Sequence, residues 1–261
     1  MLGISHISKT FHPGTVDEKL ALNDLSLHLA PGDFVTIIGS NGAGKSTLFN
    51  AICGSFLTDS GAIVLDGEDV TFAPEYRRAR QIGRLFQDPM RGSAPHMTIE
   101  ENLALAAGSR GWFSHVGKKE KQLFRDRLSL LDMGLEDRMR QPVGLLSGGQ
   151  RQALTLLMAS LQKPKLLLLD EHTAALDPAT AKKVLDISDS IIRENGLTAL
   201  MITHNMKDAI NHGTRLIMMN EGHIILDVEG EEKKKLTKQQ LMEKFAEIAG
   251  KQVESDRILL S

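Results

Sequence analysis

The spacing of hydrophobic and polar residues changes along the chain and predicts where strands and helices lie. From 20 to 29 apolar and polar positions roughly alternate, as in a half-buried strand, and Pro31-Gly32-Asp33 then marks a turn. Phe34–Ile38 and Leu166–Leu169 are short, uninterrupted apolar runs, which are typical of strands buried on both faces. Three longer segments are predicted as helices: 44–56, 118–133 and 179–194.

This alternation of strand and helix predicts an α/β fold in which a mostly parallel sheet is covered by helices on both faces. Further strands are predicted at Leu197–Thr203 and Arg215–Asn220. Asp66-Gly67, between two short segments, is a two-residue hairpin signal, so we expect an antiparallel patch near the N-terminus. From about 88 to 146 the pattern turns helical, and Thr98–Glu101 has the spacing of a capping box.

Composition limits the classes of protein but indicates no function. The 261 residues suggest one large domain or two small ones, and 31 basic against 33 acidic residues give a formal net charge of −2. This balance, and an aromatic content of only 4%, do not favour a surface for nucleic acid. The single cysteine, Cys53, cannot form an internal disulfide, and no apolar run is long enough to span a membrane. We therefore expect a cytoplasmic α/β protein.

Residues 39–46 read Gly-Ser-Asn-Gly-Ala-Gly-Lys-Ser and fit the phosphate-binding pattern G-x-x-x-x-G-K-S/T. Glycines let the backbone curl so that its N–H groups point at phosphate oxygens, and the following helix adds its positive N-terminal end. Lys45 is expected to hold the β- and γ-phosphates of ATP, and the Ser46 hydroxyl to ligate Mg²⁺. The nucleotide-binding residues predicted here are Gly39, Ser40, Asn41, Gly42, Ala43, Gly44, Lys45, Ser46 and Thr47.

A second candidate for chemistry is Asp170-Glu171, which follows the apolar run Leu166–Leu169. An apolar strand that ends in a carboxylate delivers it to the carboxyl edge of a parallel sheet, where phosphates and Mg²⁺ bind. Asp170 is therefore predicted to hold Mg²⁺ through water. Glu171 is predicted to be the general base that polarises the attacking water. Alone, this pattern is also compatible with an ordinary strand end, and the phosphate loop makes the functional interpretation the better one.

The pentapeptide 146–150, Leu-Ser-Gly-Gly-Gln, opens another predicted helix and offers a second anion-binding N-terminus. It is the signature of the ABC ATPases, and the chain resembles that family over about residues 2–228. Further motifs fall in the family's order: Gln87 resembles the Q-loop glutamine, 174–177 the D-loop and His204 the switch histidine. On spacing alone, a histidine at the end of an apolar strand is equally compatible with a structural role.

The resemblance implies that ATP lies between two chains, in a homodimer or in a pair with a paralogous ATPase. The phosphate loop and Asp170-Glu171 of one copy would face Ser147 and Gly149 of the other, and Asp177 would lie across the dimer interface. The signature and D-loop residues implied at the nucleotide are Ser147, Gly148, Gly149, Gln150 and Asp177.

Single residues also take roles from the resemblance. Gln87 would touch Mg²⁺ and sense a transmembrane partner, and His204 would hold the γ-phosphate and the attacking water. Phe11 is the candidate that stacks on adenine, and a packed strand residue is its alternative. The catalytic set is then Glu171, His204 and Gln87, and the metal set is Ser46, Gln87 and Asp170.

In domain terms the resemblance implies a P-loop NTPase core with an N-terminal antiparallel β-subdomain and an inserted α-helical subdomain. The predicted division is 1–87 and 153–230 for the core, 88–152 for the helical signature subdomain and 231–261 for a C-terminal helical tail. Lys233–Lys235 in the tail predicts a solvated helix face, with a membrane-surface patch as the alternative.

One ATPase unit without a long coiled-coil insertion favours a transporter subunit over a DNA-repair clamp or a translation factor. The resemblance implies a separate permease that holds the chain at the inner face of the membrane, and a separate substrate-binding protein. Segments 111–158 and 170–175 are similar to predicted tryptophan/tyrosine importers, which indicates uptake of an amino acid. Two alternatives remain, a soluble ATP-dependent regulatory or clamp protein and a nucleic-acid-dependent ATPase.

Overall fold

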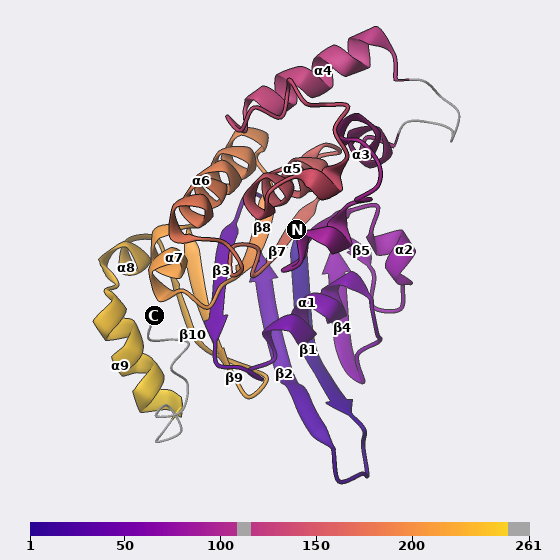
Figure 1. Ribbon diagram of the computed structural model, residues 1–261. Helices are drawn as coiled ribbons and strands as arrows, with labels where there is room; N and C mark the ends of the chain where they lie inside the picture. The colour runs from indigo at the N-terminus through magenta and orange to yellow at the C-terminus, as the bar shows by residue number, and fades with distance from the viewer. Residues whose placement is uncertain (109–115, 250–261) are drawn as a thin grey trace.

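The computed structural model describes residues 1–108 and 116–249. Residues 111–115, which begin the importer-like segment, and 250–261, which end the predicted tail, lie outside the described residues. Two sheets and several helices make up the described chain (Figure 1). The antiparallel sheet has the order β2-β1-β4-β5 and contains β1 Leu2–Phe11, β2 Lys19–Leu29, β4 Ser60–Leu65 and β5 Glu68–Asp69. The larger sheet has the order β10-β9-β3-β8-β7-β6 and contains β3 Phe34–Gly39, β6 Ile82–Leu85, β7 Leu166–Asp170, β8 Thr198–Ile202, β9 Arg215–Asn220 and β10 His223–Glu229.

The larger sheet is parallel from β9 to β6, and β10 joins it antiparallel to β9. Strand β7 shows why its apolar run is uninterrupted. Leu166 and Leu168 belong to one buried cluster, which includes helix α1, Lys45–Cys53, and Leu167 and Leu169 belong to another. Successive strand residues point to opposite faces, so both faces of β7 are buried. The predicted α/β fold is confirmed.

The antiparallel sheet packs on the same buried cluster as α1, so that α1 lies between the two sheets. The predicted hairpin joins β4 to β5, with Leu65 opposite Glu68. Asp66 and Gly67 have φ values of 51° and 84°. Both positive values suit a tight two-residue turn between antiparallel strands.

The helical region has a core of its own, to which α3, α4 and α5 each contribute. The predicted capping box is present, since Thr98 accepts from the Glu101 backbone and the Glu101 side chain accepts from the Thr98 backbone. The remaining helices and short 3₁₀ turns are α2 Glu75–Arg78, η1 Pro89–Gly92, α3 Ile99–Ala106, α4 Lys118–Ser129, η2 Val143–Leu145, α5 Gly148–Ser160, α6 Pro178–Asn195, α7 Met206–Asn211, α8 Gly230–Lys235 and α9 Lys238–Ala249.

Helix α5 connects this helical region to the sheet. Leu154 and Leu157 pack in the helical core, and Leu156 packs in the cluster that covers the sheet. The predicted boundary between 152 and 153 falls inside this continuous helix, and the division of the chain into subdomains stays a prediction. None of the described helices is long and apolar enough to cross a bilayer.

In the described part of the tail, α9 packs on α7, and α8 lies against β9 and β10 (Figure 1). Leu241 and Phe245 of α9 are buried there with Met206 and Ala209 of α7. The expectation of a solvated face over 233–235 is wrong for its first residue. The Lys233 side chain is buried because its ammonium donates to the backbone carbonyls of His212 and Gly213, just after α7.

Candidate active site

The phosphate loop connects β3, which ends at Gly39, to α1, which begins at Lys45. Gly44 has a φ of 100°, and a Cβ atom there would lie 2.6 Å from the carbonyl oxygen of Ala21. Both the conformation and the close approach require glycine. The Lys45 ammonium is buried, and it donates to the carbonyl oxygens of Gly39 at 2.6 Å and Ser40 at 2.9 Å. The lysine is thus held against the loop that it is predicted to serve.

The second strand of the site is β7, which delivers Asp170 and Glu171. Strands β3, β8 and β7 are neighbours and parallel, so their carboxyl ends meet at one edge of the sheet. The Glu171 N–H donates to the carbonyl oxygen of Ile202, the last residue of β8, at 3.1 Å. Glu171 has a φ of 47°, a left-handed conformation that is uncommon outside glycine and often found at active sites.

The structure brings His204 to Glu171. His204 Nε2 lies 2.6 Å from Glu171 Oε1, and both side chains are largely buried. The hydrogen bond from His204 lowers the pKa of Glu171 and outweighs burial, which raises it. Glu171 is therefore held in the ionised form, which a general base must have before it accepts a proton. Of the two interpretations of His204, the geometry favours the one that places it in the site.

Asp170 has a different partner, Arg84 on the neighbouring strand β6. Arg84 Nη2 lies 3.3 Å from Asp170 Oδ2. Burial raises the pKa of Asp170, while the positive charges of Arg84 and Lys45 lower it. Nothing in the sequence pattern singled out Arg84. An arginine in a short apolar strand was the available signal, but its partner is known only from the strand pairing.

The residues predicted to hold Mg²⁺ fit that ion. Ser46 offers a hydroxyl, Asp170 a carboxylate and Gln87 an amide oxygen, all of them oxygen ligands of the kind Mg²⁺ prefers. Ser46 is the second residue of α1, next to Lys45, and Gln87 follows β6 at the carboxyl edge of the sheet. Within 1–108 and 116–249 no group of three His, Cys, Asp or Glu side chains is placed so that it could hold a metal ion by itself. A site with one carboxylate suits a metal that also binds substrate phosphates.

Phe11 lies at the end of β1, opposite Lys19 at the start of β2. Its ring meets the Phe56 ring edge-on, with centroids 5.3 Å apart. A Cβ atom on Gly42 would lie 3.2 Å from Lys19 Nζ, so the lysine reaches the phosphate loop. Phe11 and Lys19, which face each other across the two strands, therefore connect the predicted adenine end of the site with its phosphate end. Sequence reasoning missed Lys19, because only the strand register places it there.

The signature lies at the start of α5. Ser147 caps this helix through a capping box with Gln150, and both Ser147 and Gly148 are exposed. A Cβ atom on Gly149 would lie 2.1 Å from Thr180 Cγ2, so glycine is required where α5 crosses the start of α6. Asp177 caps α6 by accepting from the Thr180 N–H at 3.1 Å. Signature and D-loop are therefore packed on each other.

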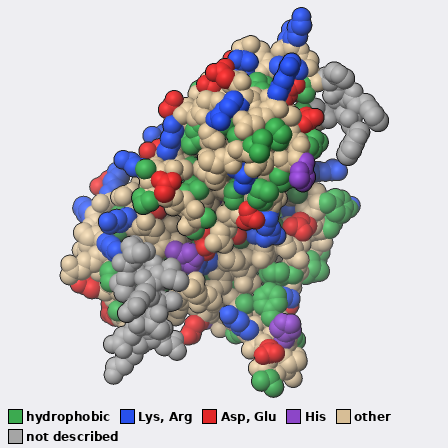
Figure 2. Space-filling view, in the orientation of Figure 1, with side chains coloured by type: hydrophobic (Ala, Val, Ile, Leu, Met, Phe, Trp, Pro, Cys, Tyr) green, Lys and Arg blue, Asp and Glu red, His purple; other side chains and the backbone are tan. Residues whose placement is uncertain are grey.

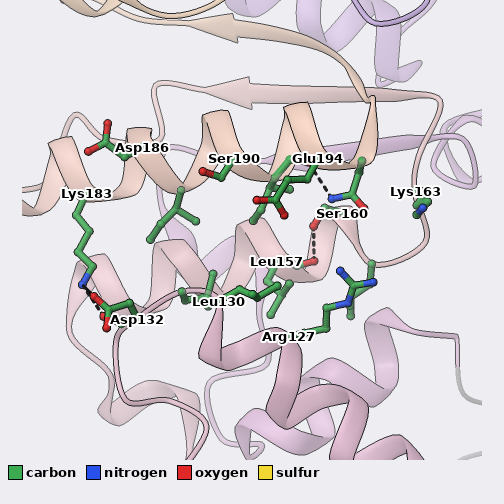
Figure 3. Close-up of a pocket in the computed structure, with 15 residues that line it drawn as sticks. Arg127, Leu130, Asp132, Leu157, Ser160, Lys163, Lys183, Asp186, Ser190 and Glu194 are labelled. Atoms are coloured by element: carbon green, nitrogen blue, oxygen red, sulfur yellow. Dashed lines mark hydrogen bonds and ion pairs between the residues drawn. The ribbon is translucent and has the colours of Figure 1, made fainter.

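A cavity of about 300 Å³ lies behind this contact, between α4, α5 and α6 (Figure 3). Lys183 of α6 and Asp132 face each other at one end of it. The Lys183 ammonium donates to the Asp132 carbonyl oxygen at 2.5 Å and lies 3.0 Å from its carboxylate. This exposed pair is a contact between α6 and the segment that follows α4.

Comparison with known proteins identifies the family. The chain matches the model of the ABC transporter family over residues 22–174. It is 44% identical over 248 residues to the tyrosine transport ATP-binding protein of Clostridioides difficile strain R20291, covering 94% of this chain and 98% of that protein. It is 34% identical over 225 residues to the glycine betaine/carnitine/choline transport ATP-binding protein OpuCA of Bacillus subtilis strain 168, covering 86% of this chain and 57% of that one.

The chain belongs to the ABC transporter family and is an ATP-binding subunit of an ABC transporter. Solved structures agree. The dimeric ATP-binding cassette MJ0796 with bound ADP and Pi superposes with a TM-score of 0.75 at 26% identity, covering 88% of this chain and 98% of that one. For cbiO1 of Clostridium perfringens, at 24% identity, the TM-score of 0.75 shows the fold alone, over 99% of this chain and 97% of that one. The predicted family is confirmed.

Proposed function

We propose that this chain hydrolyses ATP with Mg²⁺ and thereby powers uptake of an amino acid, tyrosine or a close relative, through a separate permease. The observation that carries the proposal is the 44% identity, over almost the whole of both chains, to a tyrosine transport ATP-binding protein. The relatives described above are named for transport, which favours a transporter subunit over a soluble regulatory or clamp protein.

In the proposed reaction, Lys45 and the backbone N–H groups of the phosphate loop hold the β- and γ-phosphates. Glu171 accepts a proton from water as the water attacks the γ-phosphorus. The bond from that phosphorus to the β–γ bridging oxygen breaks, ADP leaves with the bond's electrons, and His204 keeps Glu171 and the water in line. Bound Mg²⁺ would neutralise charge on the phosphate oxygens, and Ser46, Asp170 and Gln87 would hold it. A positioned base of this kind contributes about 10²–10⁴-fold to the rate.

The signature has its role in a second copy of the chain, or in a paralogous ATPase. Ser147 and Gly148 are exposed at the positive end of α5, a suitable surface for the γ-phosphate held by another chain. MJ0796, the structural relative that binds ADP and Pi, is dimeric. We propose that the phosphate loop of each copy faces the signature of the other, with Asp177 near the contact.

A groove of about 550 Å³ between β6, α3 and α5 is the proposed docking site of the permease. Its lining includes the basic residues Arg80 and Arg91 and the apolar residue Leu105, which is 58% exposed. The groove is continuous with the segment that carries Gln87. On the face shown in Figure 2, basic and acidic side chains are otherwise interspersed. A docked permease would hold the chain at the cytoplasmic face of the membrane and receive substrate from a separate binding protein.

The test is transport in liposomes that contain the permease with this chain bound to it. With ATP inside and the binding protein outside, we expect labelled tyrosine to accumulate inside the liposomes. With the Glu171→Gln protein in place of the native chain, we expect no accumulation. Uptake of another amino acid in preference to tyrosine would correct the substrate. A chain that hydrolyses ATP but neither binds the permease nor supports any uptake would favour the regulatory alternative.

A further inference from the structure

Arg84 is a charged residue inside a strand of the central sheet. Its side chain is only 15% exposed, and so is that of Asp170. Strands β6 and β7 are parallel, with Arg84 opposite Leu168. Asp170 lies two residues beyond Leu168 and therefore on the same face of the sheet. The register thus places the guanidinium diagonally against the Asp170 carboxylate, and Nη2 reaches Oδ2 at 3.3 Å.

Aromatic stacking fixes the guanidinium in this place. Its central carbon lies 4.9 Å from the centroid of the Phe86 ring, and the Arg91 guanidinium lies at the same distance from that ring. The Nε atom of Arg84 is buried and has no hydrogen-bond partner. A buried donor without a partner lowers the stability of the fold. The contact of Arg84 with Asp170 therefore needs another explanation than stability, and a role at Asp170 supplies one.

The stack also connects the carboxylate to other parts of the predicted machinery. Phe86 directly precedes Gln87, and its carbonyl oxygen accepts from the Gln152 side chain of α5 at 3.3 Å. Arg84 and Arg91 both line the groove between β6, α3 and α5. Arg84 therefore lies between the predicted magnesium site and the proposed permease site.

We propose that Arg84 is a positioning residue that orients the Asp170 carboxylate for Mg²⁺. By holding Oδ2, the guanidinium would keep the carboxylate from rotating and leave Oδ1 available to the metal. This inference rests on the proposed role of Asp170 at Mg²⁺. Arg84 does not touch nucleotide or metal in this proposal, and acts only through Asp170. A lysine in this position would keep the positive charge but would lack the planar guanidinium and its several N–H donors.

The experiment compares the affinity for a fluorescent ATP analogue with excess Mg²⁺ and with EDTA. The dissociation constant in EDTA divided by that with Mg²⁺ gives the factor by which the metal strengthens binding, and we call this factor the ratio. Arg84→Met should lower this ratio about tenfold, the usual effect of removing a partner of a metal ligand. Binding in EDTA should not change, because Asp170 has no metal to hold there. Arg84→Lys should lie between the two proteins, and the exposed Arg77→Met on α2 should match the native chain.

An unchanged or larger ratio in Arg84→Met overturns the inference. An equal loss of binding with and without metal is one way to reach an unchanged ratio, and it indicates a purely structural role. If Arg84→Met does not fold, Arg84→Lys carries the test, with an about threefold lower ratio expected and an unchanged ratio overturning the inference. Asp170→Asn separates the magnesium role of Asp170 from the positioning role of Arg84. If Asp170→Asn leaves the ratio unchanged, Asp170 does not hold Mg²⁺, and the proposed function is wrong at this residue whatever Arg84 does.

Discussion

Two regions of the molecule bind phosphate in the proposed function, and they are built differently. At the carboxyl edge of the sheet, Lys45, Asp170 and His204 all lie against other groups of the same chain: Lys45 against the loop carbonyls, Asp170 against Arg84 and His204 against Glu171. We call this region the hydrolytic edge. At the start of α5, Ser147 is exposed and bonds only locally, to Gln150 of its own helix, in the contacts described above.

In the proposed function, this difference shows how binding and hydrolysis of ATP are divided between two copies. The hydrolytic edge has the proposed base, its histidine and the buried carboxylate arranged within one chain. The signature has an exposed, positively polarised helix end that is braced from behind by Thr180. One region is suited to perform the reaction, and the other is suited to close over a phosphate that it does not itself hold.

The largest effect is expected at the hydrolytic edge. Glu171→Gln removes the proton acceptor but preserves size and most contacts, so kcat should fall about 10²–10⁴-fold. ATP binding should persist, because the phosphate loop is unchanged. Steady-state hydrolysis and equilibrium nucleotide binding measure the two quantities. The same replacement at Glu194, which is exposed on α6, is the matched control and should leave hydrolysis unchanged. A native rate in Glu171→Gln would remove the base assignment.

A pH effect is expected just behind this edge, at His172. Its imidazole is buried, and Nε2 lies 3.1 Å from the Ser188 hydroxyl, which itself donates to the Val184 carbonyl. Burial lowers the pKa of His172 from 6.5 to about 4. Below pH 6.5 the unfolded chain binds a proton there that the folded chain does not. Protonation thus favours unfolding, and the free energy of unfolding should lose about 3 kcal/mol between pH 7 and pH 4.

Urea unfolding at several pH values measures this contribution, with His172→Gln as the comparison. Glutamine keeps an N–H donor for Ser188 but does not titrate, so the difference between the two proteins should shrink or reverse toward pH 4. Parallel pH profiles would show that His172 is not held neutral.

A smaller effect is expected at the signature. Gly149→Ala places a Cβ atom within 2.1 Å of Thr180 Cγ2, so the free energy of unfolding should fall by about 1–3 kcal/mol from overpacking. Turnover should fall because the helix start moves, while ATP binding at the phosphate loop should remain. Thr180→Ser removes the clashing methyl and keeps the N–H that Asp177 caps. The double variant should regain stability. If Gly149→Ala is as stable as the native chain, the close approach is not real.

Much of the fold could be predicted because local residue patterns carry it. The apolar run before Asp170 shows a strand buried on both faces, and Asp66-Gly67 shows a hairpin. The capping box at Thr98 depends on residues three positions apart, and the structure contains it. The hydrolytic edge was also accessible, since parallel strands bring their carboxyl ends together whatever the details of packing.

The rest depends on contacts between distant segments. Arg84 meets Asp170 only through the register of β6 on β7, and Lys19 reaches Gly42 only through the pairing of β1 with β2. Lys233 looked solvated in a charged run, but the fold buries it against the backbone carbonyls of His212 and Gly213, just after α7. Charge patterns describe a helix by itself and contain no information about what it packs against.

The most direct test of the divided site is the mass of the Glu171→Gln protein in solution with Mg²⁺ and ATP, measured by light scattering. We predict twice the 28.6 kDa of one chain, and a single-chain mass when ATP is omitted. Adding Lys45→Ala, which weakens the hold on ATP, should return the protein to the single-chain mass. A Glu171→Gln protein that binds ATP and stays at the mass of one chain would contradict the account.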